Sequence, residues 1–287
     1  MSPVSPVVAT HELGRRLRER RETLGLAAAE LARAARCTPQ FLSQVETGKK
    51  IPALEKLTAI FARLEIDEPE MSELLALREQ GVRRGPYAAY SGIFSTEILR
   101  FFGFEHGAES IFSFGGGLIH GLLQTQAYAR AVIQAGGPYI RQAEVERRVQ
   151  ARLARQARLD GPDPISLTVV MTEAAIRQQV GGPEVLAQQL THVVEQVEAC
   201  RPRLDVRVIP FSAAGHPALG SSTFHLLGFP SGRLPTMLWL ETVTTTDLID
   251  DPAVVHEYQL THAGALDVAL DLTDSLGLIT SVAKDLR

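Results

Sequence analysis

The chain has 287 residues, of which 45% are hydrophobic and 22% are charged, and its formal net charge at pH 7 is −4. This length predicts two domains, because a single domain usually contains about 100–200 residues. The hydrophobic share is ordinary for a globular protein and excludes wholesale disorder. Cys37 and Cys200 are far apart in the sequence, which argues against a disulfide framework or a thiolate zinc site.

Residues 1–10, MSPVSPVVAT, read as a flexible N-terminus without the basic and apolar regions of a signal peptide. The longest apolar runs elsewhere are shorter than the ~18 residues that a membrane span needs. We therefore expect a cytoplasmic protein with no membrane partner.

Charge divides the chain into a basic head and an acidic body. Residues 1–63 contain eleven Lys or Arg and six Asp or Glu, a formal charge of +5, so the rest of the chain carries −9. The acidic overall charge therefore does not exclude nucleic acid as a partner of the head.

Helical periodicity predicts a mainly α N-terminal domain of about five helices over residues 11–80. Leu13, Leu17 and Leu24 form an apolar stripe, and an Ala-rich helix follows at 27–35. A third helix begins at Thr38, and two more are expected at 53–64 and near 69–80.

The helix in TPQFLSQVETGKK has clear signals at both ends. Thr38 is a favourable N-cap, Pro39 suits the first helical position, and Gly48 can adopt the left-handed conformation that ends a helix. The apolar side chains expected to face inward are Phe41, Leu42 and Val45.

The outward face of this helix suits the DNA major groove. Gln40 and Gln44 are four residues apart and share that face. A Gln amide can both donate to and accept from adenine, which neither Lys nor Glu can do. Thr38, Lys49 and Lys50 are expected to contact DNA phosphates, which fix the register without reading sequence.

LRERRETLGLAAAELARAARCTPQFLSQVETGKKIP resembles the helix-turn-helix of the phage-repressor-like Xre family. The resemblance adds Ser43 to the base-reading positions and implies a structural pair between Arg21 and Glu46. The sequence departs from the family pattern at Ala28, at Pro39 and at Arg36, which replaces a helix-ending glycine. A left-handed Arg36 would cost about 1 kcal/mol.

Residues 81–92 contain Gly, Pro and two arginines and read as a linker. Beyond it, residues 93–287 alternate helix and strand signals, which predicts an α+β regulatory and partner-binding domain with a helix-covered sheet. Helices are expected at 94–105, 126–135, 139–159, 184–199, 253–270 and 274–285, and strands in SIFSFGG, SLTVVMT, DVRVIPF, STFHLLGF and TMLWLETV.

The body has no recognisable catalytic, cofactor or metal motif. FGGGLIHG lacks the Gly-Lys-Ser/Thr ending of a phosphate-binding loop. In HEYQLTH, His256 and His262 would be about 240° apart around a helix axis, too far for shared metal binding. We therefore expect no catalytic residues, no cofactor, no metal and no enzymatic activity.

The basic helix RQAEVERRVQARLARQARL has two interpretations. Its arginines could form a solvated face with intrahelical pairs to Glu144 and Glu146. They could instead form a surface for an acidic partner. The arginines concerned are Arg147, Arg148, Arg152, Arg155 and Arg158.

A second resemblance covers about residues 88–285. GLLQTQAYARAVI, MTEAAIRQQVGGPEVLAQQL and VRVIPFSAAGHPALGSSTFHLL are similar to the uncharacterised domain that follows an Xre-type helix-turn-helix in many actinobacterial regulators. That family implies a one-component regulator, often encoded beside a small partner protein.

We therefore predict a sequence-specific regulator that binds double-stranded DNA as a homodimer, because helix-turn-helix proteins commonly bind paired half-sites. Its C-terminal domain is expected to receive a signal from a small protein encoded nearby. The alternative is an antitoxin-like protein that sequesters such a partner and binds DNA mainly for autoregulation.

Overall fold

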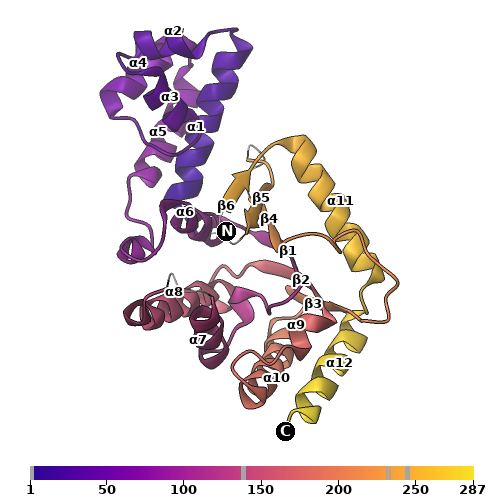
Figure 1. Ribbon diagram of the computed structural model, residues 1–287. Helices are drawn as coiled ribbons and strands as arrows, with labels where there is room; N and C mark the ends of the chain where they lie inside the picture. Colours follow the sequence, from indigo (N-terminus) through magenta and orange to yellow (C-terminus); the bar gives the residue numbers. More distant parts are fainter. Residues whose placement is uncertain (1–2, 137–139, 231, 233, 243–245) are drawn as a thin grey trace. The chain divides into compact units, whose positions relative to one another are not determined.

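The protein is described from a computed structural model, which covers residues 3–136, 140–230, 232, 234–242 and 246–287. The described chain forms two compact units that divide after residue 88 (Figure 1).

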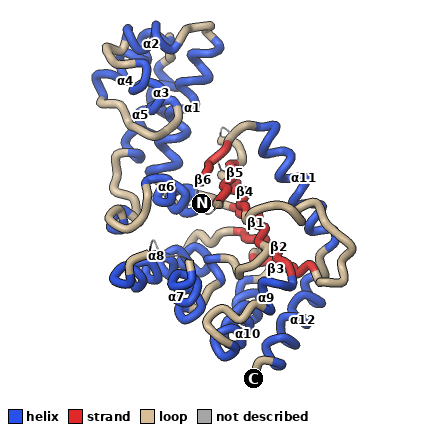
Figure 2. The backbone as a smooth tube through the Cα atoms, viewed as in Figure 1, coloured by secondary structure: helices blue, strands red, loops and turns tan. Residues whose placement is uncertain are grey.

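The N-terminal unit consists of helices packed around one core, which confirms the mainly α prediction (Figure 2). Leu13, Leu31, Leu42, Leu57 and Leu74 come from five different helices and are all at most 1% exposed. The helices are α1 Pro6–Thr23, α2 Ala28–Ala34, α3 Pro39–Glu46, α4 Leu54–Leu64 and α5 Glu68–Gly81.

Helix α1 begins earlier than the flexible N-terminus predicted for residues 1–10 would allow. Pro6 occupies the first helical position, and the Ser5 side chain accepts a hydrogen bond from Val8 N at 3.5 Å. Both features favour a helix start. Residues 6–10 therefore belong to α1, and the flexible segment was predicted too long.

The C-terminal unit contains a six-stranded sheet in the order β3-β2-β1-β4-β5-β6. Strands β1, β2 and β3 are parallel to one another. On the other side of β1, β4 pairs with β1, β5 with β4 and β6 with β5, and each of these pairs is antiparallel. The strands are β1 Ser110–Gly115, β2 Ser166–Thr172, β3 Leu204–Ile209, β4 Phe224–Gly228, β5 Met237–Glu241 and β6 Thr246–Ile249.

Helices cover both faces of this sheet, as predicted. Val255 and Ala265 of α11 pack against buried residues of β1, β2, β4 and β5 on one face (Figure 1). On the other face, Phe101 of α6 stacks on residues of β4 and β5. The helices are α6 Thr96–Gly107, α7 Gln126–Ala135, α8 Gln142–Asp160, α9 Glu173–Arg177, α10 Pro183–Cys200, α11 Pro252–Val268 and α12 Leu272–Asp285, with short 3-10 turns at Ala88–Tyr90 and Gly121–Leu123.

At Val208, the outer edge of β3 is covered by the turn between α11 and α12 and by the start of α12. Leu270 N donates to Val208 O at 2.9 Å, and Val208 N donates to Ser275 Oγ at 3.0 Å. These bonds satisfy backbone groups that an open edge strand would offer to another chain.

Each helix and strand expected in the body is present, with ends shifted by a few residues. The expected helix start at residue 139 and the end of the TMLWLETV strand lie outside the described residues. Helix α9 and strand β6 were not predicted, because segments of five and four residues carry little periodicity.

The end of the expected linker is attached to the C-terminal unit. Arg147 Nη2 donates to Ala89 O at 3.2 Å, and Arg148 Nη2 donates to Ile93 O at 2.5 Å. Among the described residues, no helix is long and apolar enough to cross a membrane.

Candidate nucleic-acid interface

Helix α3 has the ends that its sequence predicted. The Thr38 hydroxyl oxygen accepts a hydrogen bond from Phe41 N at 3.1 Å, and Pro39 occupies the first turn. Gly48 has a φ of +63°. Because the Thr38 oxygen accepts at the cap, its O–H can still donate outward.

The three side chains proposed to read bases all have solvent access. Gln40 and Ser43 are exposed and Gln44 is partly exposed, whereas Leu42 and Val45 are buried in the core. Helix α3 therefore presents a polar face on the side opposite its apolar anchors.

Lys49 and Lys50 are placed immediately beside the end of this polar face. Their backbone N–H groups both donate to Gln44 O, at 2.8 and 2.9 Å. Both side chains are exposed. The two charges are thus held next to Gln44 by the backbone turn, where they can meet a phosphate backbone.

Phe41 packs against the core, as expected, but it is only partly buried. The ammonium groups of Lys50 and Lys56 lie 5.8 and 5.0 Å from its ring centroid. Lys56, in the first turn of α4, was not among the sequence candidates. Its position could not be found from local spacing, since Lys56 follows Phe41 by 15 residues and only the tertiary fold brings the two side chains together.

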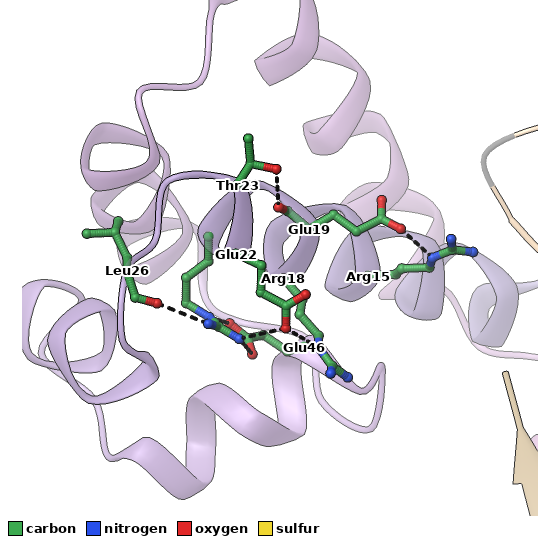
Figure 3. A network of polar contacts seen from close by, with 8 residues as sticks. Arg15, Arg18, Glu19, Glu22, Thr23, Leu26 and Glu46 are labelled. Atoms are coloured by element: carbon green, nitrogen blue, oxygen red, sulfur yellow. Dashed lines mark hydrogen bonds and ion pairs between the residues drawn. The ribbon is translucent and has the colours of Figure 1, made fainter. Parts of the chain in front are cut away.

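Arg21 and Glu46 lie together, at the two positions that the family resemblance paired. Arg21 Nε donates to Glu46 Oε1 at 2.6 Å, and Nη2 donates to Glu46 Oε2 at 3.0 Å (Figure 3). Arg21 Nη1 also donates to Leu26 O at 3.0 Å. The hydrogen bonds to Glu46 raise the pKa of the Arg21 guanidinium.

Two glycines allow α1 to approach α3 closely. A Cβ on Gly14 would lie 2.0 Å from Val45 O, and a Cβ on Gly48 would lie 2.5 Å from His11 Cα. Neither position can hold a larger residue without moving backbone. Close packing against α1 therefore fixes the orientation of α3.

Arg36 adopts the left-handed conformation expected at the end of α2, with a φ of +49°. Its N–H donates to Arg33 O at 3.1 Å, and Cys37 N donates to Ala32 O at 2.9 Å. These bonds close the turn between α2 and α3 and offset part of the backbone strain.

The arginines of α8 form a solvated face only in part, since Arg147 is exposed and Arg148 is partly exposed. Arg155 and Arg158 are buried, and Arg152 is partly buried. Arg155 makes two hydrogen bonds of 2.6 and 2.7 Å to the fully buried Glu105. One expected intrahelical pair is present, because Arg148 Nη2 lies 3.2 Å from Glu144 Oε2.

Ser113, which is buried, and His225, which is partly buried, form the pair that most resembles catalytic machinery. Ser113 Oγ lies 2.8 Å from His225 Nδ1. Burial, together with the nearby Arg155 cation, lowers the pKa of His225 to about 3. A general base works best with a pKa near the operating pH, so this histidine is poorly suited to activate a serine. Within the described part of the chain, no group of three His, Cys, Asp or Glu residues could hold a metal ion.

Two family models match the chain. One is described as a domain of unknown function (DUF5753) and matches residues 98–281, and the other is described as a helix-turn-helix domain and matches residues 12–74. No curated protein and no solved structure matches the chain.

Proposed function

Because the chain belongs to the DUF5753 family and carries a helix-turn-helix domain before that region, we propose that it is a sequence-specific transcriptional regulator. A helix-turn-helix domain supports a DNA-binding regulator. The finer proposal is that α3 enters the major groove with Gln40, Ser43 and Gln44 toward the bases. Thr38, Lys49 and Lys50 then contact phosphates.

The observation that carries this proposal is the geometry at the end of α3. Gln44 is the last of the proposed base-reading residues, and its backbone oxygen accepts from both Lys49 N and Lys50 N. One short segment thus places amides suited to adenine beside cations suited to phosphates. The two kinds of contact would act together on one stretch of duplex.

A homodimer is the assembly that best fits this mode of binding. Helix-turn-helix proteins read half-sites about one helical turn apart, so two recognition helices are needed for a two-fold operator. Light scattering on the purified protein should give twice the monomer mass, and on operator DNA it should give the mass of two protein chains plus one duplex. A one-to-one complex on a palindromic operator would contradict this assembly.

We propose the C-terminal unit as the receiver of the regulatory signal, which is carried by a small protein in the cytoplasm. Residues 89–287 contain 15 Lys or Arg and 21 Asp or Glu, a formal net charge of −6, and this field would steer a basic or amphipathic partner. The α8 arginines contribute less to such a surface than the sequence suggested, since Arg155 and Arg158 are buried. The proposal of a protein partner therefore depends on the net negative charge of the C-terminal unit.

The DNA-binding proposal is tested by selecting operators from random duplexes with the full chain. Gln40→Ala and Gln44→Ala should each relax base preference, at a cost of roughly 1–3 kcal/mol of discrimination. Lys49→Ala should weaken binding to all sequences and reduce its salt dependence.

Matched controls lie in the other unit. Gln142 and Lys284 are exposed residues of α8 and α12, and their alanine variants should select the same operator with unchanged affinity. If both α3 glutamine variants kept the original preference, the assignment of α3 residues to bases would be wrong.

The partner proposal is tested by a pull-down with separate units. Residues 89–287 should capture the small protein encoded beside this gene, whereas residues 3–88 should not. Capture by residues 3–88 alone would contradict the assignment. A small molecule that changes operator affinity while no protein is captured would also contradict it.

A further inference from the structure

Apolar side chains are exposed along one face of α11. Leu260 is 59% exposed and Val268 is 39% exposed, and Gly264 lies between them. These three positions are four residues apart, so they follow one another along the same face of the helix. Single exposed apolar residues are normal on a protein surface, whereas a contiguous set is typical of an interaction site.

The loop between β3 and β4 extends this apolar surface (Figure 1). A Cβ on Gly264 would lie 2.7 Å from Pro217 Cγ, so the loop touches α11 at this glycine. Leu219, two residues after Pro217, is 74% exposed. The loop therefore places a second exposed leucine close to the apolar face of α11.

The turn that carries Leu219 is anchored in the core. Leu219 N donates to His216 O at 3.0 Å, which closes the turn. Ala218 is fully buried in the same hydrophobic cluster as Ala265 of α11. The His216 ring centroid lies 5.6 Å from that of Phe114 in β1. Because the turn is already fixed, a partner that covers Leu219 does not have to order the loop first.

The charge around this surface is negative. Helix α11 contains no Lys or Arg, and its two acids, Glu257 and Asp267, are both exposed. They lie three residues before and seven residues after Leu260, so both are on its side of the helix. Residues 208–283 contain eight Asp or Glu and one Arg, a formal charge of −7. The negative charge of the C-terminal unit is thus concentrated in the segment that carries the exposed leucines.

This combination of apolar and acidic groups favours one kind of partner. A second copy of the chain docked through the same face would bring like charges together, and an anionic lipid surface would be repelled for the same reason. A helix that has an apolar stripe flanked by Lys or Arg complements both features, because its stripe covers the leucines while its cations meet the carboxylates.

We propose that α11 and the turn at residues 216–219 form the docking surface for a basic amphipathic helix of a partner protein. The apolar stripe of that helix covers Leu219, Leu260 and Val268, and its cations lie beside Glu257 and Asp267. This inference rests on the proposed function, since it assigns a surface and a binding chemistry to the protein partner of the C-terminal unit.

The probe is a fluorescently labelled 18-residue peptide of leucine and lysine with its leucines on one helical face. Its anisotropy is followed during titration with the full chain, beside a counterpart in which glutamate replaces every lysine. The lysine peptide should bind at least about tenfold more tightly, and its affinity should fall as salt increases. Absence of binding, or equal affinity for the two peptides, would overturn the proposal.

Apolar variants localise the binding. Leu219→Gln and Leu260→Gln should each weaken binding of the lysine peptide by about fivefold or more, because each loses apolar area that the peptide would cover. Leu54→Gln is the matched control, since Leu54 is a leucine of α4 that is 52% exposed, and it should leave the affinity unchanged. Unchanged affinity in both Leu219→Gln and Leu260→Gln would overturn the assigned surface.

Charge variants test the acidic groups separately. Glu257→Gln combined with Asp267→Asn should weaken binding about fivefold at low salt. Glu195→Gln combined with Glu198→Gln removes two exposed carboxylates of α10 and should change the affinity less than about twofold. Equal losses in the two double variants would show that only the overall charge matters, which would overturn the surface.

The surface and the proposed function fail in different ways. If the full chain captures the neighbouring small protein equally well with and without Leu219→Gln and Leu260→Gln, the surface is wrong and the partner proposal stands. If the parent chain captures no such protein, the partner proposal fails whatever the peptide does. A Leu260→Gln variant that turns a dimer into a monomer in light scattering would assign this face to the contact between two copies and overturn the inference.

Discussion

Arg21 of α1 and Glu46 at the end of α3 are joined by two parallel hydrogen bonds, with N···O distances of 2.6 and 3.0 Å. Their side chains are only 12% and 7% exposed. Because the pair is largely shielded from water, it ties the end of α3 to α1 more firmly than a surface ion pair could. The proposed base-reading face depends on this attachment.

Arg21→Ala should destabilise the N-terminal unit by about 1–4 kcal/mol, because it leaves the largely buried Glu46 without its partner. Urea unfolding of residues 3–88, followed by far-UV circular dichroism, would measure the loss. Arg18 and Glu22 form a matched exposed pair at 2.8 Å, with side chains 55% and 50% exposed. Arg18→Ala should cost about 0.5 kcal/mol or less. Equal losses in the two variants would contradict a special role for Arg21.

Gly14→Ala should also destabilise the N-terminal unit, by about 2 kcal/mol or more, because its Cβ would overlap Val45 O unless α1 and α3 move apart. Gly277, in α12, is a matched helical glycine with open space at its Cβ position. Gly277→Ala should stabilise its unit by about 0.5–1 kcal/mol, the ordinary gain in helix propensity. Thermal melts of both variants would compare them, and a neutral Gly14→Ala would mean that the two helices can separate at little cost.

The sequence allowed the ends of α3 to be predicted because their causes are local. Thr38, Pro39 and Gly48 act within one turn of the residues that they affect, so composition and spacing were enough. The paired positions of Arg21 and Glu46 came from a family pattern, since residues 25 apart cannot be matched by spacing. The close contact of Gly14 with α3 could not be predicted from the sequence, because a glycine inside a helix can have several causes besides close packing.

The environment of the α8 arginines could not be predicted, because their partners are also far away in the sequence. Glu105 precedes Arg155 by 50 residues, and only the packing of α6 against α8 brings them together. Helical periodicity describes which residues share a face of α8. It does not identify what covers that face, and here it is covered by Phe101 and Phe102, whose ring centroids lie 5.5 and 4.3 Å from the Arg155 guanidinium.

Glu105→Gln should destabilise the C-terminal unit by about 3–5 kcal/mol, because it leaves the buried Arg155 cation without a countercharge. Fluorescence of Trp239, the one tryptophan in the sequence, would follow unfolding of this unit in urea. The double variant Glu105→Leu with Arg155→Met should recover much of the loss, since the apolar pair has no buried charge. If Glu105→Gln were as stable as the parent chain, water would have to hydrate the Arg155 cation in place of Glu105, which would contradict this prediction.

Stability of the C-terminal unit should fall as pH decreases from about 6.5, because of its buried histidines. An unfolded histidine binds a proton near pH 6.5, whereas burial lowers the pKa of His225 in the folded unit to about 3. Between these values the unfolded chain binds more protons, so acid favours unfolding. The contribution is about 1.4 kcal/mol per pH unit for each such histidine well below pH 6.5.

Replacing His225 should therefore reduce this pH dependence. His225→Asn removes the titrating ring and retains a polar group beside Ser113. Its free energy of unfolding, measured by Trp239 fluorescence in urea at pH 6 and 5, should fall less than that of the parent chain by about 1 kcal/mol. His120 is also buried with a lowered pKa, so part of the dependence should remain. Equal slopes in the His225 variant and the parent would mean that His225 acquires its proton without unfolding.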